Sequence, residues 1–169
     1  LKHPYLFEYN DPVAQTGYNR TIYTAFTGDE ALLNRAEAYV MKGEFESALA
    51  DLNLWTNNAL NAAQCTPNLT LDSVKEWCNG LAYYKWDIPT PKKKINNPFV
   101  EVKEGSDLEA MLQATLYIRR VEFLHYGMRF FDIKRHGIEI YRREVGTALE
   151  INKVTDSLTV NDPRRALQL

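Results

Sequence analysis

The sequence has little of what usually reveals a chemistry. Its 169 residues include two cysteines, three histidines and three methionines. No phosphate-binding loop, G-x-G-x-x-G, G-x-S-x-G or H-E-x-x-H motif occurs in it. His3, His125 and His136 are far apart in sequence, so we interpret them as ordinary, partly buried side chains. No metal site, catalytic residue or cofactor is therefore predicted.

An excess of charge of one sign and long apolar runs are also missing. Lys and Arg number 20 and Asp and Glu 22, for a net charge of −2, which argues against a protein that mainly coats nucleic acid or anionic lipid. No apolar run approaches the roughly 18 residues of a membrane-spanning helix. The first residues, Leu1–Tyr5, resemble no signal peptide and begin without Met. We therefore expect a mature or excised piece of a longer chain.

The two cysteines, Cys65 and Cys78, are too far apart for a C-x-x-C redox or zinc motif. In an oxidising compartment a disulfide between them would close a loop whose restriction stabilises the fold by about 3 kcal/mol. Alternatively they are two ordinary thiols, with Cys78 on the apolar side of a short helix. The sequence leaves both interpretations open.

Hydrophobic residues make up 45% of the chain, enough for the core of one domain. Hydrophobic periodicity predicts a helix over 28–42, begun by a capping box at Thr27–Glu30 and ended by Gly43. A second helix is predicted over 44–59. The small and large positions of this pair match the pattern of a tetratricopeptide repeat: Ala36, Tyr39, Gly43, Phe45, Ala48 and Leu52. A lone repeat cannot bury both of its faces, so another part of the protein must cover it.

The remaining segments have less regular patterns. Residues 60–105 are predicted to be a loop-rich insertion with one short helix over about 70–79. A second capping box, Ser106–Glu109, opens a long helix over 106–137, clearest over 107–126 and interrupted at Gly127. Residues 138–169 are predicted to be an irregular C-terminal segment with one more helical turn at 138–143 and a small hairpin within 146–160. Residues 1–26 are predicted to be irregular with a short strand over 21–26.

The predicted fold class is therefore mainly α. It consists of a tetratricopeptide-like helix pair over 27–59, a long helix and extended irregular loops, which together form a single region over 1–169.

Four aromatic side chains crowd into ten residues of the insertion: Trp77, Tyr83, Tyr84 and Trp86. Flat aromatic faces stack on the apolar faces of sugars, and the amides of Asn79 and Asn96 are suited to bonding hydroxyls. We therefore predict that these aromatics bind a glycan. The alternative is that they anchor a long loop to the body of the domain.

The sequence does not favour nucleic-acid binding or glycoside hydrolysis. Residues 119–143 carry a net charge of +4, which suits a phosphate backbone. Their charges also fall at i,i+3 spacing, however, and predict three intrahelical pairs: Arg119 with Glu122, Arg129 with Asp132, and Asp132 with Arg135. Glycoside hydrolysis needs only two carboxylates at the right separation, but most carboxylates here occupy polar helix faces or stand beside Lys.

Three segments of the chain together resemble the SusD/RagB family. Leu33–Tyr39 with Gly43 is similar to one helix motif of the family, and Arg119–Arg135 is similar to its R-R-x-E and G-x-R-x-F-D helix. Asp162–Arg165 resembles its late D-P-R turn. The segments agree with the family in order and spacing and extend over nearly the whole chain. Three positions depart from the usual residues: Ile118, Tyr126 and His136.

The resemblance implies the C-terminal portion of a cell-surface lipoprotein of the Bacteroidetes outer membrane, with the lipidated N-terminus outside this chain. Such proteins bind glycans or other nutrients, without catalysis, and pass them to a SusC-like TonB-dependent outer-membrane transporter. It also implies a mostly helical fold in which tetratricopeptide-like pairs lie beside an irregular ligand-binding part. We expect an oligosaccharide or other nutrient as ligand and no nucleic acid. The alternative function is a tetratricopeptide-like scaffold that binds a protein segment.

Overall fold

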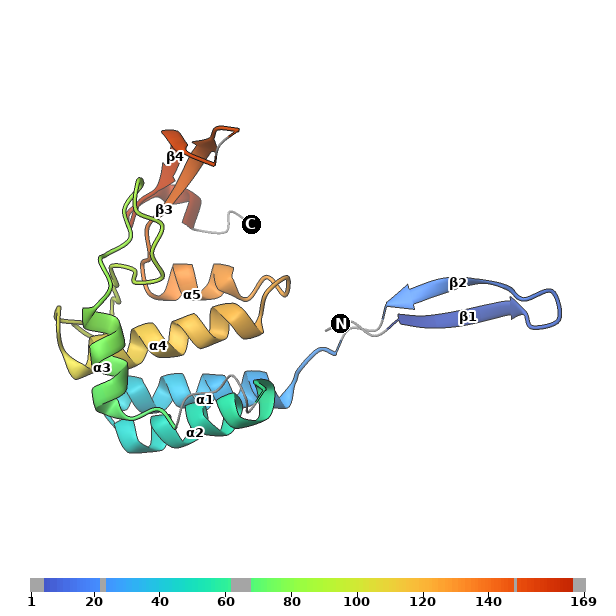
Figure 1. Cartoon of the computed structure of the whole chain (residues 1–169), viewed down its shortest axis with the longest axis horizontal. Coiled ribbons are helices and arrows are strands. Elements are labelled where there is room, and N and C mark those ends of the chain that lie inside the picture. The colour runs from blue at the N-terminus through green and yellow to red at the C-terminus, as the bar shows by residue number, and fades with distance from the viewer. Residues whose placement is uncertain (1–4, 22–23, 62–67, 148, 166–169) are drawn as a thin grey trace. The chain divides into compact units, whose positions relative to one another are not determined.

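The computed structural model describes residues 5–21, 24–61, 68–147 and 149–165. The chain divides into two compact units, Leu1–Ala31 and Leu32–Leu169. The elements that the described residues form are, in chain order, β1 (Tyr5–Asp11), β2 (Thr16–Thr21), α1 (Gly28–Lys42), α2 (Phe45–Ala59), α3 (Leu71–Asn79), α4 (Asp107–Glu122), α5 (Arg129–Arg135), β3 (Ile140–Val145), β4 (Ile151–Leu158) and the short 3₁₀ helix η1 (Pro163–Arg165) (Figure 1).

The fold is mixed α and β, so the prediction of a mainly α fold is wrong. Helices account for 43% of the described residues, and two antiparallel two-stranded sheets accompany them. Strands β1 and β2 form a hairpin in the segment predicted to be irregular. Phe7 and Tyr9 lie two residues apart and meet edge to face at 4.8 Å, and the Asp11 carboxylate accepts the backbone N–H of Val13 in the turn. Of the strand expected over 21–26, Thr21 ends β2, residues 24–26 are not in a strand, and residues 22–23 lie outside the described residues.

The C-terminal segment contains the second hairpin. Strand β3 occupies residues for which one more helical turn was expected, and it pairs with β4 from Ile140 opposite Leu158 to Val145 opposite Ile151. The predicted hairpin exists, but it begins at Ile140 because β-branched and aromatic side chains favour an extended backbone there. The segment is therefore more regular than predicted.

The first three helices confirm the predictions from periodicity and capping. The Thr27 hydroxyl accepts the N–H of Glu30 at 3.1 Å, at the start of α1. Thr70 and Ser73 form a complete capping box on α3. None of the helices in the described ranges is both long and apolar enough to cross a bilayer.

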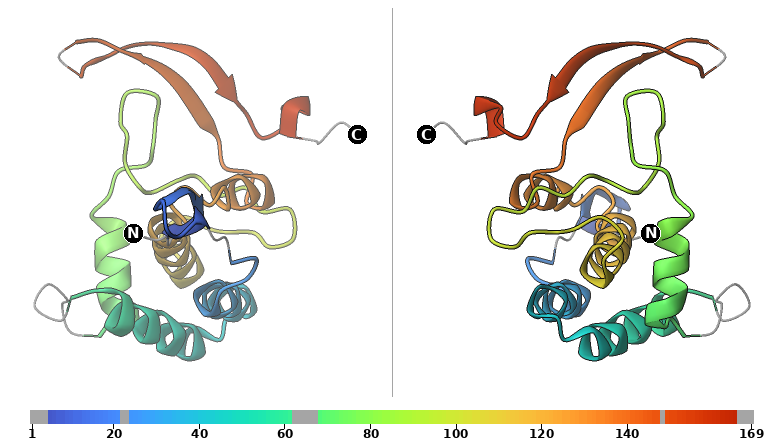
Figure 2. Two further views of the ribbon diagram at one scale, coloured as in Figure 1. Left: turned by 90° about the vertical axis from the view of Figure 1, so that its right-hand side faces the viewer. Right: turned by 90° about the vertical axis from the view of Figure 1, so that its left-hand side faces the viewer.

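Helix α4 covers the helix pair α1–α2. Ala36 of α1 and Ala48 of α2 are fully buried, which allows close packing in this layer. Helix α4 lies beside α1 in both views, and the Trp55 indole of α2 donates to Glu122 of α4 at 3.1 Å (Figure 2). Helix α4 is therefore the neighbour that a lone helix pair was expected to need.

The helix predicted over 106–137 ends earlier than expected, at Glu122, and the predicted interruption at Gly127 is confirmed, because the chain reverses there between α4 and α5. His125 and Gly127 have φ angles of +70° and +77°, which a right-handed helix cannot include. Helix α5 therefore folds back alongside α4 (Figure 1). The reversal brings the acidic side chain of Asp132 against α4.

Candidate functional site

Three of the four predicted site residues lie on a loop, residues 81–92, that returns on itself through backbone hydrogen bonds. The Tyr84 N–H donates to the Lys92 carbonyl at 2.7 Å, and Lys85 and Ile88 exchange N–H···O bonds of 3.1 and 3.2 Å. The Thr90 hydroxyl closes the base by donating to the carbonyl of Ala82 at 2.7 Å. These bonds give the loop one defined conformation.

Tyr83 fixes the start of the loop to the N-terminus of α4. Its hydroxyl donates to the Glu109 carboxylate, which also accepts the Gly105 N–H at 2.8 Å. The Lys92 ammonium lies 4.4 Å from the centre of the Tyr83 ring. Burial and then the Glu109 carboxylate raise the pKa of Tyr83 well above its usual range. Tyr83 is therefore a structural anchor.

Tyr84 is occupied in the same way. Its ring stacks on Tyr141 of β3 at 5.6 Å and 26°. The Lys93 ammonium lies 3.1 Å from the ring centre and the Arg143 guanidinium 4.6 Å from it. Three neighbours thus lie against this ring, which leaves little of it for a sugar.

Trp77 also packs inward. It is half-buried on α3, and its ring meets Tyr117 of α4 at 5.6 Å. The anchoring alternative thus describes Trp77, Tyr83 and Tyr84.

Trp86 differs from the other three, because 45% of it is exposed. Its backbone is nevertheless fixed. Arg143 donates to the carbonyl of Trp86 through Nε and to the carbonyl of Lys85 through Nη2, the latter at 2.7 Å. The indole is therefore presented to solvent from a loop held by β3.

The two amides predicted to assist differ in availability. Asn79 is exposed at the end of α3. Asn96 donates its side-chain N–H to the Gly137 carbonyl at 3.1 Å, and its backbone N–H bonds to the carbonyl of His136. Asn96 thus joins the loop before α4 to the residues after α5.

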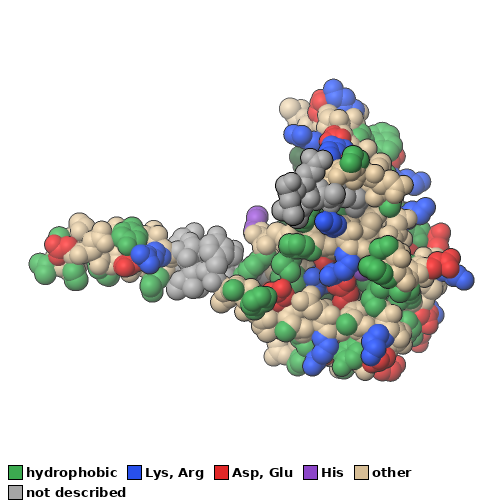
Figure 3. Space-filling view, turned by 180° about the vertical axis from the view of Figure 1, so that it is seen from behind, with side chains coloured by type: hydrophobic (Ala, Val, Ile, Leu, Met, Phe, Trp, Pro, Cys, Tyr) green, Lys and Arg blue, Asp and Glu red, His purple; other side chains and the backbone are tan. Residues whose placement is uncertain are grey.

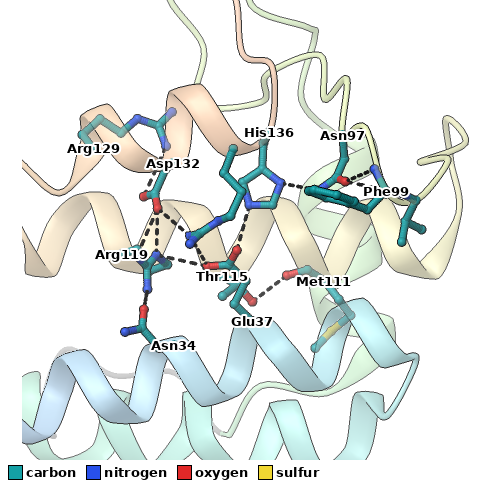
Figure 4. Close-up of polar contacts among 12 residues, drawn as sticks. Asn34, Glu37, Asn97, Phe99, Met111, Thr115, Arg119, Arg129, Asp132 and His136 are labelled. Carbon is teal, nitrogen blue, oxygen red and sulfur yellow. Dashed lines mark hydrogen bonds and ion pairs between the residues drawn. The ribbon is translucent and has the colours of Figure 1, made fainter. Parts of the chain in front are cut away.

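A buried polar network lies between α1, α4 and α5 and centres on Arg119 (Figure 4). Arg119 is 1% exposed. Its Nη1 donates to Asn34 at 2.5 Å, and its Nε donates to Asp132 Oδ1 at 3.1 Å. Glu37 adds an ion pair at 3.5 Å. One arginine of α4 thus joins a polar side chain of α1 to the carboxylate of α5.

Glu37 and His136 complete this network. The Glu37 carboxylate lies 2.8 Å from His136 Nε2 and accepts from Arg135 at 2.7 Å. Burial acts to raise the pKa of Glu37, but His136, Arg135 and Arg119 outweigh it and leave the pKa lowered. Because Glu37, Arg119, Asp132 and His136 are buried and paired, we interpret the network as structural.

Two of the three predicted helix pairs are confirmed. Asp132 lies 4.0 Å from Arg129 and 3.1 Å from Arg135. The predicted pairing of Arg119 with Glu122 is wrong, because α5 folds back and brings Asp132 to Arg119.

Among the described residues, no group of three or more His, Cys, Asp or Glu side chains is arranged so that it could hold a metal ion. Cys78 is a buried thiol whose pKa is raised by burial. Cys65 lies outside the described residues, so the predicted alternatives for the pair stay open.

Acidic and basic side chains are interspersed on the face seen in Figure 3, as the near-neutral net charge predicts. No family model, curated protein or solved structure matches the chain.

Proposed function

We propose that the chain is a non-catalytic glycan-binding component of a SusC/SusD-type outer-membrane uptake system. The observation that carries the binding proposal is the geometry of Trp86: an exposed indole on a loop whose backbone is fixed by Arg143. A rigid aromatic surface of this kind stacks on a sugar with little loss of conformational entropy.

The family assignment and the transporter partner rest on the resemblance of the three sequence segments. The buried network supports treating two of these segments as one unit. Asn34 and Glu37 come from the first, and Arg119, Asp132 and Arg135 from the second. A cell-surface location and delivery to a TonB-dependent transporter belong to the same proposal.

Native affinity electrophoresis tests the binding proposal. The chain is run through gels that contain amylopectin, xyloglucan, galactomannan or polygalacturonate, beside Trp86→Ala and Phe99→Ala variants. Phe99 is 84% exposed and lies outside the predicted cluster, so Phe99→Ala is a matched control that also removes an exposed aromatic side chain. We expect at least one gel to retard the wild type and Phe99→Ala, but not Trp86→Ala.

Three results would count against the proposal. Equal retardation of all three proteins would remove Trp86 from the site. Absence of retardation in every gel, together with binding to an unstructured peptide, would favour the alternative of a tetratricopeptide-like scaffold. Release of reducing ends from a retarding polysaccharide, lost on a single carboxylate change, would instead indicate a glycoside hydrolase.

A further inference from the structure

A small pocket on α4 is lined by three cations and by no acidic residue. Its walls are Pro91, Lys93, Gln113, Leu116, Tyr117, Arg120 and Arg129. The pocket is shallow: only about 10 Å³ of it is enclosed space that a water-sized group can occupy, and the rest is open to solvent. An anion would therefore meet the three cations at the mouth of the pocket rather than fill a closed cavity.

The lysine of the pocket is held in place. Gln113 accepts the Lys93 backbone N–H at 3.0 Å and donates its side-chain N–H to the Lys93 carbonyl. The Lys93 ammonium donates to the Thr90 carbonyl at 2.8 Å and lies over the Tyr84 ring. Lys93 is only 9% exposed. Its ammonium is therefore largely removed from water, which raises the free energy of the charged form.

The two arginines of the pocket lack full partners. Arg129 Nη1 is buried and makes no hydrogen bond within the described part of the chain, and its ion pair with Asp132 spans 4.0 Å. Asp132 already accepts from Arg119 and Arg135. Arg120 has no ion pair among the residues that the structure describes.

Electrostatics in the pocket show the same shortage of negative charge. Burial, and then the charges of Arg120, Arg129 and Arg143, lower the pKa of Lys93 to about 7. Burial is also the largest cause of the lowered pKa of Arg129, which Asp132 only partly offsets. Buried, crowded cations without a matching anion are costly unless a ligand supplies the opposite charge.

We propose that Lys93, Arg120 and Arg129 form an oxyanion-binding pocket that takes a single sulfate, phosphate or carboxylate group. Guanidinium and ammonium groups form their strongest hydrogen bonds with such anions. The group is either a free ion or the acidic substituent of a larger ligand such as a uronic acid. The proposal stands on the pocket alone and does not depend on sugar binding by Trp86.

Isothermal titration with sodium sulfate at constant ionic strength tests the pocket, because sulfate keeps its charge across neutral pH. We expect saturable binding that weakens at least tenfold in Arg120→Gln and in Arg129→Gln. Arg142→Gln and Lys94→Gln remove exposed cations outside the pocket and are expected to bind as the wild type does. Arg120 is exposed, so its variant is expected to fold even if Arg129→Gln does not.

Two results would overturn the proposal: no saturable sulfate binding by the wild type, or equal weakening in the control variants. Titrations with glucuronate and with glucose then distinguish a free ion from the acidic substituent of a larger ligand. Binding of glucuronate but not of glucose, lost in Arg120→Gln, assigns the pocket to an acidic substituent, and binding of sulfate alone assigns it to a free ion. Trp86→Ala is expected to bind sulfate normally, so loss of polysaccharide binding in that variant leaves the pocket proposal standing.

Discussion

Arg119 is the buried residue on which the contact between α1, α4 and α5 most depends. Its guanidinium lies among Asn34, Glu37 and Asp132, and every one of these contacts joins α4 to another helix. Without it, the buried carboxylates of Glu37 and Asp132 would each lose a fully buried counter-charge. Removing one partner from a buried pair costs about 3–5 kcal/mol because the remaining charge stays buried.

We therefore predict that Arg119→Met lowers the free energy of unfolding by about 3–5 kcal/mol, measured by urea denaturation. Arg142→Met, a change of the same size at an exposed position, is expected to cost less than about 1 kcal/mol. Comparable losses in the two variants would show that the buried network adds nothing specific.

Gly137 is the second residue whose identity the structure requires. Its φ angle is +55°, and an added Cβ would lie 2.5 Å from the carbonyl oxygen of Asn96. That oxygen belongs to the backbone of Asn96. It cannot move aside without breaking the hydrogen bonds between Asn96 and the residues after α5.

Gly137→Ala is accordingly expected to destabilise the protein by about 2 kcal/mol or more, through backbone strain and overpacking together. Gly43→Ala is the matched control, since Gly43 also has a positive φ but open space around it, and it should cost about 1 kcal/mol. Unfolding midpoints in urea would contradict the account if Gly43→Ala were the more damaging change.

Lys93 makes stability depend on pH. Its pKa is about 7 in the folded chain, because of burial and the charges of Arg120, Arg129 and Arg143; in an unfolded chain it is about 10.4. The unfolded state therefore binds more protons between these values. The contribution of Lys93 to stability rises with pH across this window and is lost as pH falls toward 7.

The difference in unfolding free energy, wild type minus Lys93→Met, is predicted to increase by about 2 kcal/mol from pH 7 to pH 9. Lys94→Met, beside it but exposed, should show no such trend. Denaturation curves at the two pH values test this, and a flat difference for Lys93→Met would mean that its ammonium is not penalised in the fold.

At the scale of elements, strand β3 positions the loop over 81–92. Arg143 bonds two successive loop carbonyls, and Tyr141 stacks on Tyr84. The hairpin β3–β4, whose first strand occupies residues expected to form a helical turn, is therefore the support of the candidate site.

Arg143→Gln is predicted to speed hydrogen exchange at the amides of Lys85 and Ile88 by tenfold or more, because the loop loses its bonds to β3. Arg142→Gln changes the exposed neighbour on the same strand and should leave both rates unchanged. Nuclear magnetic resonance exchange measurements decide between these outcomes. Equal rates in both variants would show that the loop holds its conformation without β3.

At the scale of the whole molecule, local signals predicted some of the structure and long-range contacts determined the rest. Helices α1 to α3 follow from periodicity and caps, which involve residues close in sequence. The hairpins and the reversal after α4 depend on pairings between segments, which single positions such as Gly127 only suggest. This is why the mainly α prediction failed.

The same distinction applies to the candidate site. Clustering in sequence singled out four aromatics, but contacts with other segments determine which of them is exposed. Glu109 engages Tyr83, Tyr117 lies against Trp77, and β3 provides the partners of Tyr84. The cationic pocket was missed altogether, because Lys93 and Arg129 meet only after the chain reverses.

The central claim, that the exposed indole of Trp86 binds a sugar, is tested most directly by the indole N–H signals of the three tryptophans. The protein labelled with ¹⁵N is titrated with the oligosaccharide of whichever polysaccharide retards it in the gel. We predict that the Trp86 signal shifts saturably, while that of Trp55, whose indole is buried and bonded to Glu122, does not move. Saturable binding without a shift at Trp86 would contradict the account.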